Sequence, residues 1–150
     1  MKTSKLDVKK PSSDLGHIKI AVVSTNWNKE IIKPMLEDCL TVLEEYDLEK
    51  KSFVVPGAYE LPFIAQVLSK NYDAIILLGC IIKGETPHFE IISQSISDKV
   101  LETSLDKNTP IIFGVLTTNN ESEAKERAAY KGSEFAMSAL SILDTLNKLK

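Results

Sequence analysis

The sequence is poor in cysteine and histidine. Its 150 residues include only Cys39, Cys80, His17 and His88 of these two types. The cysteines show no pairing pattern, which favours a reducing compartment, and we expect a cytoplasmic protein. None of the four side chains has the spacing of metal ligands, so the sequence predicts no metal site.

Long hydrophobic runs and an excess of basic residues are also missing. No apolar run approaches the ~20 residues needed to cross a bilayer. Residues 1–10 are polar and lysine-rich, without the apolar segment of a secretory signal. The net charge of −3 argues against nucleic acid, which would require a basic face. We therefore expect neither a membrane nor a nucleic-acid partner.

The overall composition, 43% hydrophobic and 26% charged, is ordinary for a globular domain of this length. Residues 1–16 contain Pro11, serines and several lysines but no hydrophobic period, which predicts a flexible or extended N-terminal arm. Residues 17–150 contain no internal repeat, low-complexity tract or linker, and we expect them to form a single domain.

Strand-like and helix-like segments alternate along this domain. Strands are predicted at 18–24, 52–55, 74–78 and 111–116, and helices at 29–46, 61–68, 87–105, 121–131 and 133–148. Pro34 lies inside the first helical pattern, so we expect a later start or a kink there, and Gly132 is expected to separate the last two helices. Short right-handed crossovers then predict a three-layer αβα sandwich around a four-stranded parallel sheet, a flavodoxin-like arrangement.

The central stretch follows the third predicted strand. The run 74–78 has no polar alternation, which is typical of a strand buried on both faces, and Gly79 is expected to end it. Thr86 is predicted as a helix N-cap with Pro87 at the first helical position, which places His88 in the first turn. Ligands of open α/β sheets bind at this end of the strands, and a helix N-terminus favours an anion.

Two interpretations of this stretch compete: glycines that only make turns, or a substrate site with an anion pocket and an acid–base His88. The other loops expected at the same edge leave similar alternatives. Trp27 could stack on a planar heterocycle or act as a hydrophobic staple, and Glu60 could bind ligand hydroxyls or cap its helix. Arg127 could clamp a phosphate or be a solvated surface charge, and Lys131 could be a partner of the helix dipole.

Five separated motifs, in order along nearly the whole chain from Ile18, decide between these alternatives. They are WN at 27–28, VPGAYELP at 55–62, LGCIIKGETPHFE at 78–90, FGVLT at 113–117, and ERA at 126–128 with KGSE at 131–134. Together they resemble the 6,7-dimethyl-8-ribityllumazine synthase family. The resemblance implies the penultimate step of riboflavin biosynthesis: 5-amino-6-(D-ribitylamino)uracil condenses with 3,4-dihydroxy-2-butanone 4-phosphate, without cofactor or metal.

The resemblance also implies roles for particular residues. The pyrimidine ring and ribityl chain would be held by Trp27, Gly57, Ala58, Tyr59, Glu60, Cys80, Ile81 and Ile82, and by Phe113 and Lys131 of an adjacent subunit. Glu85 and Thr86 would bind phosphate through backbone N–H groups with Arg127 as counter-charge, and His88 would transfer protons. The partners implied are the small-molecule substrates, further copies of the chain in a homopentamer or a sixty-subunit shell, and riboflavin synthase.

The chain departs from the family pattern in three places. Lys83 replaces an arginine, Trp27 replaces the usual phenylalanine, and the segment between Arg127 and Lys131 is shorter than in the common bacterial form. The short segment leaves the placement of Lys131 open and is compatible with a shell.

Two alternatives compete with this function. An archaeal-type riboflavin synthase acts on lumazine, which has no phosphate, so the retained loop at 84–88 argues against it. A flavin-binding or receiver-type module is the second alternative. A receiver should carry an acidic cluster after the first strand and an aspartate at the end of the third, but this chain has STN at 24–26 and Gly79 there.

Overall fold

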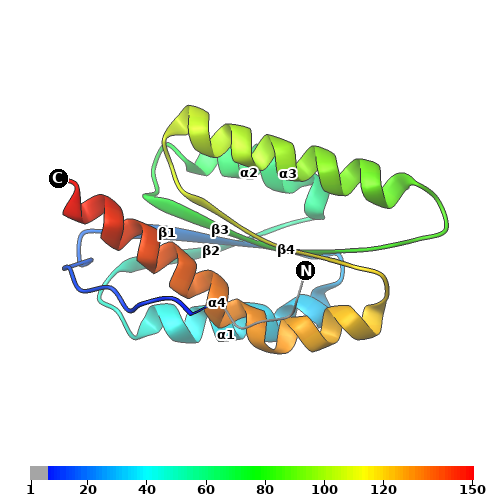
Figure 1. Cartoon of the computed structure of the whole chain (residues 1–150), viewed down its shortest axis with the longest axis horizontal. Helices are drawn as coiled ribbons and strands as arrows, with labels where there is room; N and C mark the ends of the chain where they lie inside the picture. Colours follow the sequence, from blue (N-terminus) through cyan, green and yellow to red (C-terminus); the bar gives the residue numbers. More distant parts are fainter. Residues whose placement is uncertain (1–6) are drawn as a thin grey trace.

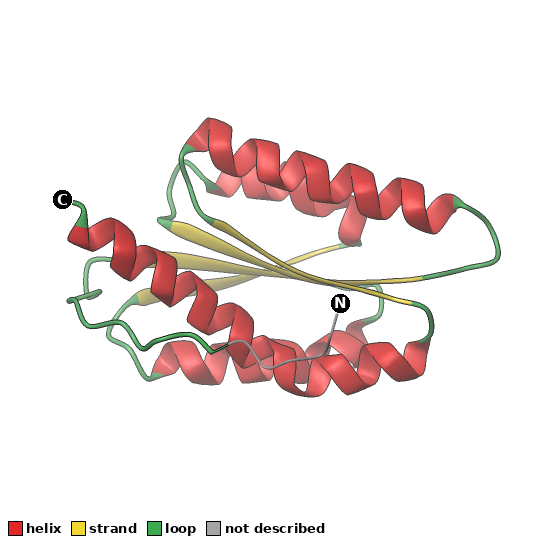
Figure 2. Ribbon diagram, in the orientation of Figure 1, coloured by secondary structure: helices red, strands yellow, loops and turns green. Residues whose placement is uncertain are grey.

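The computed structural model describes residues 7–150 as one parallel sheet between two layers of helices (Figures 1 and 2). Its elements are β1 (Lys19–Thr25), α1 (Lys29–Glu44), β2 (Glu49–Val55), the 3-10 helix η1 (Ala58–Glu60), α2 (Leu61–Leu68), β3 (Ala74–Ile82), α3 (His88–Lys107), β4 (Ile111–Thr118) and α4 (Glu121–Lys148). All strand pairs are parallel, in the order β2-β1-β3-β4. The predicted three-layer αβα sandwich is therefore confirmed.

The hydrophobic core lies on both faces of the sheet. Alternate residues of β3 point to opposite faces, so Ile76 and Leu78 pack with α1 and α4. Ile75 and Leu77 pack in the other cluster, with residues of α2 and α3. This two-sided burial explains why the sequence of β3 is a continuous apolar run rather than an alternating one.

Strand β3 is longer than predicted. It passes through Gly79 and ends at Ile82, and its register with β4 continues to the pair Ile82↔Thr118. The prediction that Gly79 ends the strand is therefore wrong. A Cβ at Gly79 would lie 3.2 Å from Leu61 Cδ1, so the glycine allows α2 to pack closely on a strand that continues.

Of the two outcomes expected at Pro34, a later start or a kink, the later start is wrong, because α1 begins at Lys29 and Pro34 lies inside it. The predicted division of the last helix is also wrong. Helix α4 runs without interruption from Glu121 to Lys148, so Gly132 does not separate two helices. Gly132 is buried where α4 crosses α1, and its missing side chain allows the two helices to approach each other.

The start of α4 is as predicted. Asn120 is the N-cap, and its side chain accepts a hydrogen bond of 2.9 Å from the backbone N–H of Glu123. The Glu123 carboxylate reaches back to the N–H of Asn119 at 3.0 Å. This reciprocal pair is close to a capping box and fixes α4 at the end of β4.

Residues 1–6 of the predicted N-terminal arm lie outside the part of the chain that the structure describes. The end of the arm contacts α4, where the N–H and the hydroxyl of Ser13 donate to the carboxylate of Asp144. Leu15 is buried in the core beside the same helix. Within residues 7–150, no helix combines the length and the apolar character of a membrane span.

Candidate active site

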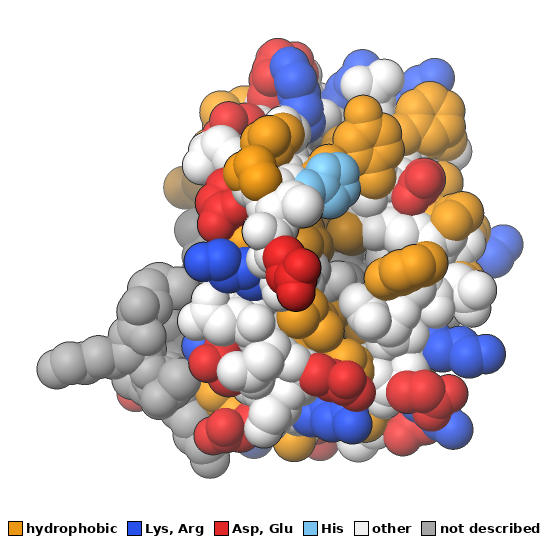
Figure 3. Space-filling model, turned by 90° about the vertical axis from the view of Figure 1, so that its right-hand side faces the viewer, with side chains coloured by type: hydrophobic (Ala, Val, Ile, Leu, Met, Phe, Trp, Pro, Cys, Tyr) orange, Lys and Arg blue, Asp and Glu red, His pale blue; other side chains and the backbone are white. Residues whose placement is uncertain are grey.

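A pocket of about 780 Å³ opens at the carboxyl end of the sheet. Figure 3 views the molecule from this end and shows hydrophobic side chains around a histidine. The lining comes from the loops after β1 and β3, from η1 and the residue before it, from the end of β3 and from the first turns of α3. It consists of Trp27, Asn28, Gly57, Ala58, Tyr59, Glu60, Cys80, Ile81, Ile82, Gly84, Thr86, His88, Phe89 and Ile92. Ligands of parallel α/β sheets bind at this position.

Most of the predicted site residues meet in this pocket. The predicted ring, ribityl and catalytic residues of the chain's own loops all line it, as does Thr86. Glu85, Phe113, Arg127 and Lys131 are not among its lining residues. The resemblance assigns each of these four residues either to phosphate or to an adjacent subunit, and Thr86 is the one phosphate residue that lines the pocket.

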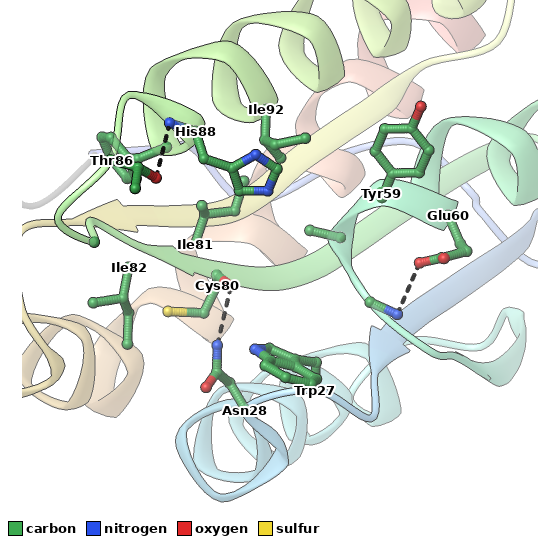
Figure 4. A pocket seen from close by; sticks show the side chains of 14 residues that line it. Trp27, Asn28, Tyr59, Glu60, Cys80, Ile81, Ile82, Thr86, His88 and Ile92 are labelled. Atoms are coloured by element: carbon green, nitrogen blue, oxygen red, sulfur yellow. Dashed lines mark hydrogen bonds between the residues drawn. The ribbon is translucent and has the colours of Figure 1, made fainter.

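The loops after β1 and β2 are joined by backbone hydrogen bonds. The N–H of Asn26 donates to Val55 O at 2.8 Å, and the N–H of Trp27 donates to Pro56 O at 2.9 Å. The hydroxyl of Thr25 donates to the carbonyl of Trp27 at 2.9 Å. The Trp27 backbone is therefore fixed although its residue is 73% exposed, and the indole faces the open pocket (Figure 4).

The carboxylate of Glu60 is oriented by its own helix. Its Oε2 accepts a hydrogen bond of 3.0 Å from the N–H of Gly57 (Figure 4), and the N–H of Glu60 donates to the backbone carbonyl of Gly57 at 3.2 Å. The second carboxylate oxygen leaves acceptor capacity toward ligand hydroxyls. Capping and ligand binding are therefore compatible roles for Glu60.

Cys80 does not present a reactive thiol. Burial raises the pKa of its thiol to about 11, so the side chain stays protonated near neutral pH. The second thiol, Cys39, is in the core, where burial and the nearby Asp38 carboxylate raise its pKa to about 12. Neither cysteine is suited to nucleophilic catalysis.

His88 begins α3 at the edge of the pocket. The predicted cap is displaced by one residue, because Pro87 occupies the N-cap position and His88 the first helical position. Thr86 still accepts a hydrogen bond, from the N–H of His88 to its hydroxyl at 3.4 Å. The imidazole lies between Ile81 and Ile92 at the pocket wall (Figure 4). A histidine in this position can exchange protons with a bound ligand beside the anion-favouring helix end.

The loop before His88 carries exposed charges. Lys83 Nζ lies 3.9 Å from Glu90 Oε1, and both side chains are at least half exposed. An ion pair of this length and exposure contributes little to stability. Glu85 is also exposed. At the start of the loop, the N–H of Lys83 donates to Thr118 O at 2.9 Å and continues the pairing of β3 with β4 by one residue.

Arg127 lies at the same end of the sheet, outside the pocket. Its Nη1 donates to Thr117 O at 3.4 Å, and Thr117 pairs with Ile81 of the pocket wall. Lys131 is one helical turn further along α4, where its Nζ is 3.0 Å from a carboxylate oxygen of Glu134, with the two side chains 26% and 11% exposed. Arg127 is thus held at the end of β4 without lining the pocket, and Lys131 is paired within its own helix.

Phe113 lies elsewhere on the sheet. It pairs with Leu77 in the middle of β3 and packs partly buried beside α2 and α3. Its distance along β4 from the carboxyl end agrees with its absence from the pocket lining.

Four lining residues are not predicted from the sequence: Asn28, Gly84, Phe89 and Ile92. All four fall in or next to the motifs already quoted, and helical spacing puts Ile92 on the side of α3 shared with His88. Among residues 7–150, no group of three or more His, Cys, Asp or Glu side chains could hold a metal ion.

Comparison with known proteins agrees with this geometry. The sequence profile of 6,7-dimethyl-8-ribityllumazine synthase matches residues 17–147. The chain belongs to this family. The 6,7-dimethyl-8-ribityllumazine synthases of Mycobacterium avium (strain 104) and Limosilactobacillus reuteri (strain DSM 20016) are similar to it. The first is 36% identical, covering 93% of this chain and 92% of that protein. The second is 39% identical, covering 85% and 87%.

The resemblance drawn from the five motifs is thereby confirmed. A third 6,7-dimethyl-8-ribityllumazine synthase, from Mycobacteroides abscessus, is 37% identical and covers 91% of this chain and 90% of its own length. A crystal structure of a 4-deoxy-L-threo-5-hexosulose-uronate ketol-isomerase complexed with a tartrate aligns with 89% of this chain and 78% of its own. Its TM-score of 0.36 and identity of 10% are too low to support any inference.

Proposed function

We propose that the protein is a 6,7-dimethyl-8-ribityllumazine synthase. It condenses 5-amino-6-(D-ribitylamino)uracil with 3,4-dihydroxy-2-butanone 4-phosphate, in the penultimate step of riboflavin biosynthesis. The observation that carries the proposal is the pocket in which Trp27, Glu60 and His88 meet at the carboxyl end of the sheet. Membership of the family supplies the identity of the two substrates.

The pyrimidine lies in the pocket between the indole of Trp27 and the wall formed by Cys80, Ile81 and Ile82. The ribityl chain extends toward the loop after β2, where Tyr59, Glu60 and the backbone of Gly57 and Ala58 bind its hydroxyl groups. A planar ring and a polyol differ in what they require, and the pocket offers an aromatic face for the first and hydrogen-bonding groups for the second.

The phosphate of the ketone binds at the start of α3. Backbone N–H groups of Glu85 and Thr86 face it, the Glu85 carboxylate points away, and Arg127 supplies a counter-charge. His88 then moves protons as the amine attacks the ketone with loss of water, phosphate is eliminated and the ring closes. These steps require orientation and proton transfer rather than a strong nucleophile. The protein therefore acts mainly by holding the two substrates close together in the orientation that the reaction requires.

The active form is an oligomer, a homopentamer that can assemble further into a sixty-subunit shell. Helices α2 and α3 cover one face of the sheet and expose large apolar side chains, Phe63 on α2 and Ile91, Leu101 and Leu105 on α3, each more than 60% exposed. An apolar surface of this kind favours contact with another subunit. Phe113 and Lys131 of that subunit complete the site, and riboflavin synthase is a further partner.

The domain boundaries follow the same proposal. Residues 17–150 form the catalytic domain. The described part of the preceding segment, residues 7–16, lies against it through Ser13 and Leu15. The enzyme acts in the cytoplasm.

The test is a condensation assay with both substrates, followed by absorbance of the lumazine product. We expect product only when both substrates are present. Consumption of lumazine alone, with no condensation, would instead identify an archaeal-type riboflavin synthase, and retained yellow flavin without turnover would identify a binding module. Light scattering on the same sample measures the native mass, and a monomer would contradict the shared site.

A further inference from the structure

Asn28 has an unusual backbone conformation at the pocket. It precedes α1 as the N-cap, with φ 61° and ψ 30°, in the left-handed region. Within residues 7–150, the only other non-glycine residue with positive φ is Asn108. Asparagine tolerates this region better than most residues, but the conformation still costs free energy relative to an ordinary one.

The Asn28 side chain does not perform the usual task of an N-cap. N-cap asparagines normally accept a hydrogen bond from the second or third N–H of the helix, and Asn28 makes no such bond. Instead its Nδ2 donates to the carbonyl of Cys80 on β3 at 3.3 Å (Figure 4). The left-handed backbone thus directs the amide across the pocket floor rather than along its own helix.

The carbonyl that Asn28 binds lies beyond the register of β1 with β3. That register ends at the pair Ser24↔Leu78, two residues before Cys80, whereas β3 continues to Ile82. Asn28 therefore supplies a donor past the end of the paired strands. It joins the loop that carries Trp27 to the strand that forms the opposite wall.

We propose that Asn28 is a positioning residue that sets the spacing between the Trp27 indole and the wall at Cys80–Ile82, and hence the width of the slot for the pyrimidine ring. This inference rests on the proposed function, because it assigns the ring of that substrate to the slot. The Trp27 backbone is held to the loop after β2 by its bond to Pro56 O, and Asn28 holds the same loop to β3.

Asn28→Gly tests the role directly. Glycine keeps the left-handed backbone without strain and removes only the amide. Because a single hydrogen bond is lost, we expect KM for the pyrimidine to rise about three- to tenfold. The substitution should weaken binding of the ring equally in the ground state and in the transition state, so kcat should stay within about twofold of wild type. KM for the phosphorylated ketone should also stay within about twofold of wild type. Asn28→Asp, which keeps the size but replaces the donor with an acceptor, should have at least the same effect.

Asn108→Gly is the matched control. It makes the same substitution at the other left-handed asparagine, the C-cap of α3, outside the pocket lining. A second measurement does not depend on turnover. Trp27 is the single tryptophan of the chain, so the decay of fluorescence anisotropy reports motion of its indole alone.

We expect faster and wider indole motion in both Asn28 variants and wild-type behaviour in Asn108→Gly. Unchanged anisotropy together with an unchanged KM for the pyrimidine would overturn the proposal. Should the wild-type protein make no lumazine, the proposed function fails. The anisotropy comparison then still decides whether Asn28 restrains Trp27.

Discussion

Gly132 of α4 lies directly against the backbone of Met35 in α1. A Cβ on Gly132 would be 2.0 Å from the carbonyl oxygen of Met35, which is closer than any real contact allows. Beside this crossing, the N–H of Ser133 donates to the Asp38 carboxylate at 2.6 Å. The missing side chain and the charged hydrogen bond together hold the two helices of this layer at close range.

Gly132→Ala should therefore destabilise the protein. Helix propensity alone would favour alanine by about 1 kcal/mol, since glycine is costly inside a helix. The clash is with backbone atoms that cannot rotate away, so overpacking should dominate and lower the free energy of unfolding by about 1–3 kcal/mol. Thermal melting followed by circular dichroism measures the change.

Gly84→Ala serves as the control for that substitution. No atom lies within 4 Å of a Cβ built at Gly84, so alanine fits there without displacement. We expect its melting temperature to equal or exceed that of wild type, because alanine restricts the unfolded chain. If Gly132→Ala and wild type had the same melting temperature, α1 and α4 could move apart without loss of stability, and the prediction would be wrong.

His88→Ala should lower kcat by about 10²-fold, the contribution of one acid–base group. Affinity for inorganic phosphate should stay near that of wild type, because the proposal assigns the anion to backbone N–H groups at the helix start rather than to the imidazole. His17→Ala is the control, since His17 is exposed just before β1 and outside the pocket lining. Steady-state kinetics and phosphate titration separate the two effects. Loss of phosphate binding in His88→Ala would contradict a purely proton-transferring role.

Arg127→Ala should raise KM for the phosphorylated ketone. Hydrogen bonds to charged groups contribute about 1.5–3 kcal/mol, so the expected rise is about 10- to 100-fold, with KM for the pyrimidine unchanged. Lys125→Ala is the matched control on the same helix, where Lys125 pairs with Glu121 at 3.0 Å on an exposed surface. Normal kinetics of Arg127→Ala would remove the phosphate-clamp role.

Asp144→Asn should reveal a pH-dependent contribution of the N-terminal segment to stability. The Ser13 hydroxyl is the main cause that holds the pKa of this carboxyl well below its ordinary value of 3.8, and Lys148, at 3.1 Å, adds to it. A depressed pKa means that the folded state favours the charged form. The contribution is therefore fully present above the ordinary value and declines as the pH falls below it.

At about pH 7 we expect wild type to have a higher melting temperature than Asp144→Asn. The gap between the two melting temperatures should narrow as the pH falls below about 4. Asp98→Asn is the control, because Asp98 accepts a hydrogen bond of 2.9 Å from Gln94, one turn away on the exposed surface of α3 and far from the N-terminal segment in sequence. A gap that stays constant down to about pH 3 would contradict the link between Ser13 and the charged carboxylate.

The order of elements can be predicted from the sequence because it depends on local periodicity. The apolar run at 74–78 predicts a strand buried on both faces, and Asn120 with Glu123 predicts the start of α4. The loops at the carboxyl ends of parallel strands must meet at one edge, so residue spacing and fold class suffice to place Trp27, Glu60 and His88 together.

Gly79 and Gly132 show where such prediction fails. Glycine usually ends an element, yet both of these glycines lie inside one. Each of them lies against a residue distant in sequence that leaves little or no room for a side chain: Leu61 beside Gly79, and Met35 beside Gly132. The role of Asn28 escapes prediction for the same reason, since its partner Cys80 is 52 positions away.

The alternation of strands and helices, the two-sided burial of β3 and the family to which the chain belongs all follow from the sequence, because they depend on residue types and their spacing. Three features emerge only in the folded molecule: α4 is one helix, β3 continues to Ile82, and Asn28 bridges the pocket floor. These features depend on distances between segments that the chain brings together only when it folds, and no local pattern encodes such a distance.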